Sequence, residues 1–106
     1  MENSKFEISA TVTLMLEKFG EDSQIDVAIE EMSELIKELV KYKRSKLHFR
    51  ERQSVSRNHV VEEISDVMFM MEYLKVIFDV TDEEIQQVVT EKAKRTRGRY
   101  ISDAEE

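Results

Sequence analysis

The sequence predicts an all-α protein made of four helices, and three observations support this fold class. The 106-residue chain contains two glycines and no proline, so it lacks the tight-turn residues that sandwiches and barrels of short strands require. Apolar residues recur at spacings of three and four along most of its length, as on one face of a helix. The length suits one small hydrophobic core, so we expect a single domain over residues 1–106.

The first two helices are predicted by apolar stripes that meet at a glycine. One helix is expected over about residues 5–19, and Gly20 stands where a left-handed residue would end it. The next helix is expected from about Ser23 to Lys43, with Ser23 or Asp22 as its N-cap. Its stripe is long and regular, as in an amphipathic helix. The apolar positions of this second stripe are Ile25, Ala28, Ile29, Met32, Leu35, Ile36, Leu39 and Val40.

The second half of the chain predicts two more helices after a polar connection. Residues 44–56 are basic and have no clear period, so we expect a long loop there. A third helix is expected over about residues 57–78. The fourth begins at Thr81, where Thr-Asp-Glu-Glu has the pattern of a capping box, and is expected to stop at Gly98. We expect residues 99–106 to fray.

The third helix is unusually apolar. From Val67 to Phe78 only Glu72, Tyr73 and Lys75 interrupt the apolar residues. A helix that is apolar on nearly every side needs neighbours on every side. We therefore expect it to be central in the domain or to pack against a second copy of the chain. A well-covered central helix in a monomer is the alternative.

Charge and composition exclude several classes of protein. The formal net charge is −7, which argues against a protein that coats nucleic acid, because phosphate binding needs clustered positive charge. The absence of cysteine removes disulfides, thiolate metal sites and cysteine nucleophiles. The longest apolar run, Val67 to Met71, is far too short to span a membrane. We expect a soluble, cytoplasmic protein without a membrane partner.

Acidic residues border the apolar stripes of the second and third helices. Glu31 and Glu34 lie three residues apart on one helix, as do Glu63 and Asp66 on the next, and residues at that spacing share a face. Like charges brought together at the edge of a core repel, and desolvation raises the cost. Four such carboxylates would suit a hard divalent cation, Mg²⁺ or Mn²⁺. The alternative is that these are ordinary solvated helix faces.

At these residues the chain resembles the MazG-like all-α nucleoside triphosphate pyrophosphohydrolases. Their signature is EExxE on one helix and ExxD on the next. Here it is matched by Glu30-Glu31-Met32-Ser33-Glu34 and by Glu63-Ile64-Ser65-Asp66, and the resemblance covers about residues 24–100. It implies a four-helix MazG-like bundle, assembled as a homodimer or dimer of dimers. It also implies Mg²⁺-dependent cleavage of a (d)NTP between the α and β phosphates, giving a (d)NMP and pyrophosphate.

The resemblance also implies roles for particular residues. Glu31, Glu34, Glu63 and Asp66 would be the metal ligands, and Glu30 or one of those ligands would take the proton from the attacking water. Basic residues near the end of the fourth helix would hold phosphates. Independently of the resemblance, His59 lies one turn before Glu63 and is a candidate to orient a carboxylate or a water molecule. The expected substrate-binding residues are Lys92, Arg95, Arg99, Tyr100 and His59.

Two other functions stay open at this point. One is a phosphoribosyl-ATP pyrophosphohydrolase, which uses a similar acidic helical site on a different nucleotide. The other is a non-catalytic helical adaptor, whose basic loop and tail would contact a partner. Neither the base nor the sugar of a nucleotide substrate can be read from the sequence.

Overall fold

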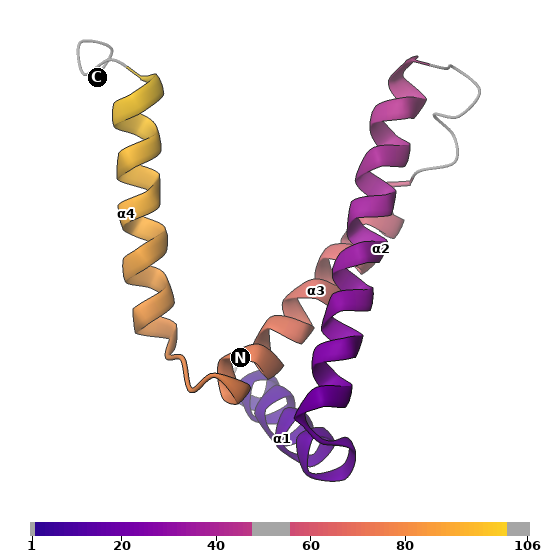
Figure 1. The fold of residues 1–106 in the computed structure, drawn as a ribbon, viewed down its shortest axis with the longest axis vertical. Helices are drawn as coiled ribbons and strands as arrows, with labels where there is room; N and C mark the ends of the chain where they lie inside the picture. The colour runs from indigo at the N-terminus through magenta and orange to yellow at the C-terminus, as the bar shows by residue number, and fades with distance from the viewer. Residues whose placement is uncertain (1, 48–55, 102–106) are drawn as a thin grey trace.

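The computed structural model describes residues 2–47 and 56–101, and within them it confirms an all-α chain of four helices without strands. Figure 1 shows their arrangement. The helices are α1 (Glu2–Phe19), α2 (Glu21–Leu47), α3 (Arg57–Ile77) and α4 (Asp82–Tyr100). Residues 48–55 of the expected loop and 102–106 of the expected frayed tail lie outside the described residues.

The α1–α2 junction is a single residue, Gly20. Its φ is +85°, the left-handed conformation that favours glycine, and its N–H donates to the carbonyl of Leu16 at 2.9 Å. Because the turn is complete at this residue, α2 begins directly after it, and the predicted start near Ser23 is two residues late. Helix α2 also continues to Leu47, so residues 44–47 are helical and were wrongly predicted as loop. No Gly or Pro interrupts them, and basic residues suit a helix C-terminus.

Side-chain caps start α3 and α4 where the sequence predicts. The Ser56 hydroxyl accepts from the His59 backbone N–H at 3.1 Å. At α4 the capping box is present, because Thr81 Oγ1 accepts from the Glu84 N–H and Glu84 accepts from the Thr81 N–H, both at 3.1 Å. The predicted stop at Gly98 is wrong, since α4 runs through it to Tyr100. A helical glycine costs only about 1 kcal/mol relative to alanine, which is too little to end a helix on its own.

The core is small and lies where α1, α2 and α3 meet. Its buried residues are Val12, Ala28, Met70 and Tyr73. Helices α2 and α3 run alongside each other, and α1 packs on both at their lower end (Figure 1). This arrangement sets α2 and α3 face to face at the level of the acidic residues.

Much of the apolar surface of α3 is not covered within one chain. Val61, Ile64, Met68, Met71 and Val76 are all exposed. Within the described residues, α3 is therefore not a well-covered central helix. The three packed helices provide too few neighbours to surround α3.

Helix α4 projects away from the other three (Figure 1), and every one of its residues is exposed. At its base, Lys75 Nζ lies 2.6 Å from Asp82 Oδ1 and 2.7 Å from Glu72 Oε2. The radius of gyration is 17.9 Å, against about 13 Å for a compact domain of this length. The expected four-helix bundle is therefore not completed within a single chain.

Within the described parts of the chain, none of the helices is long and apolar enough to cross a membrane.

Candidate metal centre

Three of the predicted ligands come together between α2 and α3. Glu31, Glu63 and Asp66 each offer a carboxylate oxygen, and these oxygens lie within 4.8 Å of one another. Glu63 and Asp66 are neighbours on one face of α3 because they are three residues apart. Packing of α2 on α3 adds Glu31 from the opposite side. Three oxygens at this spacing from two helices match the ligand type that Mg²⁺ and Mn²⁺ prefer.

The electrostatics of this cluster favour a bound cation. Burial raises the pKa of Glu31, and the charge and hydrogen bonding of Asp66, then the charges of Glu63 and Glu30, raise it further. Each of these effects disfavours the ionised form of Glu31, and a cation bound beside it would offset them by favouring that form. In addition, Glu63 Oε2 is buried and has no hydrogen-bond partner among the described residues. A buried hydrogen-bond acceptor without a partner lowers stability by about 1–3 kcal/mol. A divalent ion would give this oxygen a partner, so the three carboxylates fit such an ion.

Glu34 and Glu30 do not join the three clustered carboxylates. Both side chains are exposed on α2, and the group that the described residues form contains neither. Glu34 lies three residues after Glu31, so it borders the cluster from the solvent side. The structure thus assembles three of the four predicted ligands.

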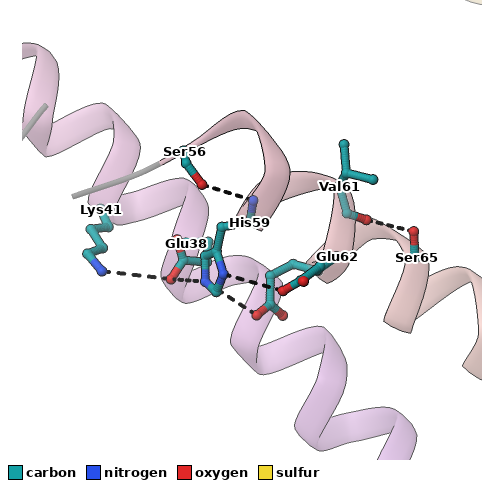
Figure 2. A network of polar contacts seen from close by, with 8 residues as sticks. Glu38, Lys41, Ser56, His59, Val61, Glu62 and Ser65 are labelled. Atoms are coloured by element: carbon teal, nitrogen blue, oxygen red, sulfur yellow. Dashed lines mark hydrogen bonds and ion pairs between the residues drawn. The ribbon is translucent and has the colours of Figure 1, made fainter. Parts of the chain in front are cut away.

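Beside the cluster, His59 makes contacts with carboxylates on both helices. Figure 2 shows His59 on α3 facing Glu38 on α2, with Nε2 3.1 Å from Glu38 Oε1. The same nitrogen lies 3.6 Å from Glu63 Oε1, while Nδ1 lies 3.9 Å from Glu62 Oε2. His59 therefore contacts the predicted metal ligand Glu63, and its expected contact with substrate stays a prediction.

Glu38 is the residue of this site that the sequence analysis did not assign. Its side chain is only 8% exposed, and its Oε2 has no hydrogen-bond partner within the described part of the chain. The signal was its position seven residues after Glu31, which places both on one helix face. A glutamate at that position on an amphipathic helix is a candidate for the edge of the same site.

An apolar cavity of about 220 Å³ opens directly onto two of the clustered carboxylates. Phe69 and Tyr73 meet edge to face in it, with ring centroids 5.1 Å apart. Gln24 and Tyr73 are buried, and burial raises the pKa of the Tyr73 hydroxyl. The lining residues are Met15, Gln24, Val27, Glu31, Asp66, Phe69, Met70 and Tyr73. An apolar cavity with a few polar groups is the usual form of a small-molecule site.

The predicted basic residues lie together, but away from the acidic cluster of the same chain. Lys92, Arg95 and Arg99 line one shallow hollow on α4 together with Thr96. Tyr100 follows at the end of α4 and is exposed. Helix α4 projects away from α2 and α3 (Figure 1), and the hollow that these basic residues line includes no residue of either helix. Among the described residues, the acidic cluster and the basic residues therefore lie on separate surfaces.

In comparisons with known proteins, no family model, no curated protein and no solved structure matches the chain.

Proposed function

We propose that the chain is a Mg²⁺-dependent, MazG-like nucleotide pyrophosphohydrolase that converts a (d)NTP to a (d)NMP and pyrophosphate. The observation that carries this proposal is the carboxylate cluster of Glu31, Glu63 and Asp66, whose oxygens lie within 4.8 Å of one another beside an apolar cavity. A triphosphate is strongly anionic, so an all-carboxylate site can receive it only through a cation. We further propose a cytoplasmic location, where nucleotides are made and used.

In this proposal Glu31, Glu63 and Asp66 hold the metal, and Glu34 completes the set when its exposed side chain turns inward. A bound Mg²⁺ or Mn²⁺ would neutralise phosphate charge and acidify a water molecule. Glu30 is exposed and close enough to raise the pKa of Glu31 by its charge. It is our candidate for the base that takes a proton from the attacking water.

The cavity beside the cluster is proposed to hold the nucleobase. At about 220 Å³ it is smaller than a complete ligand site of about 300–1,000 Å³, which suits one ring system rather than a whole nucleotide. Phe69 and Met15 offer apolar contact to a base, while the buried Gln24 amide offers one donor group and one acceptor. Met70 is also part of the cavity lining.

The phosphate-binding half of the site is proposed to come from α4 of a second copy of the chain. The chain exposes 9019 Å², whereas a compact monomer of 12.5 kDa would expose roughly 6,200 Å². The excess, about 2,800 Å² per chain or about 5,600 Å² for two chains, is at the upper end of the total area that obligate homodimers bury. Charges are complementary as well, since α4 carries Lys92, Arg95 and Arg99. A dimer, or a dimer of dimers, would cover α3 and bring basic and acidic surfaces together.

The substrate is tested with a panel of canonical and modified NTPs and dNTPs plus phosphoribosyl-ATP, scored by pyrophosphate release in Mg²⁺. Release from one or more (d)NTPs supports the proposal, and release from phosphoribosyl-ATP alone would assign the histidine-pathway alternative. Glu63→Gln should abolish activity while the protein stays folded. Glu62→Gln is the matched control, because the Glu62 side chain is 77% exposed. A chain that is inactive on the whole panel and binds no Mg²⁺ would favour the adaptor.

The shared site is tested by mixing two inactive variants. Glu63→Gln removes a ligand on α3 and Lys92→Ala removes a cation on α4. If α4 acts across the interface, a mixed dimer has one intact site of two, and an equimolar exchanged mixture should recover about a quarter of wild-type activity. No recovery after verified subunit exchange would place both residues in a site within one chain.

A further inference from the structure

The contact between Glu38 and His59 joins α2 to α3 and involves a buried carboxylate with one oxygen that has no partner among the described residues. Of the residues that the structure describes, Glu38 is the one charged residue that is buried, and only one of its oxygens has a partner among them. Its Oε1 lies 3.1 Å from His59 Nε2, whereas Oε2 is buried without one. Lys41 Nζ lies 3.9 Å from the same Oε1, near the upper limit for an ion pair. Burying a carboxylate with one oxygen unpartnered lowers the stability of the fold, which indicates that Glu38 has a role other than stabilisation.

His59 connects that buried carboxylate to the proposed metal centre. Its Nε2 lies between Glu38 Oε1 at 3.1 Å and Glu63 Oε1 at 3.6 Å. The Glu63 side chain is 12% exposed, so both carboxylates that face this nitrogen are largely removed from water. Glu62, at the other ring nitrogen, is solvent-exposed and 3.9 Å away. The contacts of His59 are thus asymmetric: the buried side of the ring faces the metal centre.

The backbone of His59 is fixed as well as its ring. Its N–H donates to the Ser56 hydroxyl that caps α3 (Figure 2). The helix cap therefore holds the backbone of His59, while the ring, 41% exposed, is placed by its contacts with Glu38 of the neighbouring helix and with Glu63. Both carboxylates face the same ring nitrogen, so this contact couples the orientation of Glu63 to that of Glu38.

We propose that Glu38 and His59 are positioning residues: buried Glu38 orients the His59 ring, and the ring holds Glu63 in the orientation that binds the divalent cation. This proposal rests on the proposed function, because it assumes that Glu63 is a ligand. Carboxylate ligands are usually held by a second layer of contacts, and loss of such contacts typically weakens metal binding or activity by about 10–100-fold. Here the second layer includes the partner helix, so the metal site depends on how α2 and α3 pack.

The experiment measures Mn²⁺ binding by calorimetry at one fixed pH, with Mg²⁺ competition, so that its readout does not require turnover. His59→Leu and Glu38→Leu should each weaken Mn²⁺ binding by about 10–100-fold. His59→Gln keeps an N–H at the place of Nε2 and should recover most of the affinity. Glu62→Gln, which alters the exposed neighbour of the same ring, is the matched control and should bind like wild type. Circular dichroism establishes that each variant is folded.

Four outcomes are distinguishable. Weak binding by the two leucine variants with recovery in His59→Gln supports the positioning role. Wild-type affinity in folded His59→Leu overturns it and leaves the proposed function intact. Equal loss in His59→Gln and His59→Leu overturns it too, since an N–H at Nε2 would then have no part. Absence of Mn²⁺ and Mg²⁺ binding by the wild-type protein overturns both this inference and the proposed function.

Discussion

Replacing Glu31 by glutamine should make the metal-free protein more stable and should remove its response to Mg²⁺. The raised pKa of Glu31 has burial as its first cause and the charges of neighbouring carboxylates as further causes. A carboxyl group whose pKa is raised by folding destabilises the folded state once it ionises, so its penalty grows as pH rises above the unfolded value. Glutamine has nearly the same shape and no charge. At neutral pH the substitution therefore removes repulsion without opening a cavity.

The size of the gain follows from the cluster geometry. The ligand oxygens of Glu31, Glu63 and Asp66 lie within 4.8 Å of one another, and two unit charges at that distance repel by about 0.9 kcal/mol in water-like screening. Asp66 is exposed, so this screened figure applies better than an interior one. Two neighbours give a gain of about 1–2 kcal/mol, which corresponds to a melting-temperature rise of about 4–8 °C or more for a small domain.

The assay is thermal unfolding of wild type and Glu31→Gln, each in EDTA and in excess Mg²⁺. At a Mg²⁺ concentration ten times the dissociation constant, binding should stabilise wild type by about 1.4 kcal/mol, and Glu31→Gln should show almost none of this. In EDTA the variant should melt higher than wild type, and at this Mg²⁺ concentration the difference between them should largely disappear. A variant that melts lower than wild type in EDTA, yet keeps the full Mg²⁺ response, would refute the reasoning.

Three further predictions concern the scaffold. Val12→Ala opens a cavity in the core, where Val12 is buried, and should cost about 1–3 kcal/mol in urea unfolding; an unchanged midpoint would contradict the assigned core. Thr81→Ala removes the α4 capping box and should cost about 1 kcal/mol, seen as lower helicity by circular dichroism, whereas Thr81→Ser should not. Lys75 holds the pKa of Asp82 below its usual value, so this pair stabilises the fold above the ordinary aspartate pKa and loses that contribution as pH falls through the lowered one. The melting-temperature difference between wild type and Lys75→Met should therefore be present at pH 7 and shrink in acid; a difference that is constant with pH would contradict the pairing.

Local signals in the sequence were enough to place the helices. Caps and breakers act within a few residues, so Gly20 and Thr81 mark helix boundaries whatever the rest of the chain does. Boundaries that rest on weaker preferences failed. Gly98 did not end α4, and the start and end of α2 were each predicted too far inside the helix. The cost of one helical glycine is small beside the hydrogen bonds of a continuing helix.

The candidate site was predicted in part. The spacing of ligands along one helix can be read from the sequence, whereas the packing that brings ligands of two helices together cannot. The three-residue spacing of Glu63 and Asp66 put them on one face of α3, and the structure adds Glu31 from α2. The contact of Glu38 with His59 depends on the register between α2 and α3, which no short-range pattern specifies. The outward course of α4 was missed for the same reason, since its direction depends on tertiary contacts at Lys75 and Asp82.

The projecting α4 has a consequence for how such an enzyme would be controlled. If the basic side chains of one chain serve the carboxylates of another, then an isolated chain has no complete active centre. At concentrations below the dissociation constant of the dimer, the protein would be inactive without any inhibitor. Its specific activity would then increase steeply with its expression level. Synthesis rate alone would then set a threshold below which the nucleotide pool is left untouched.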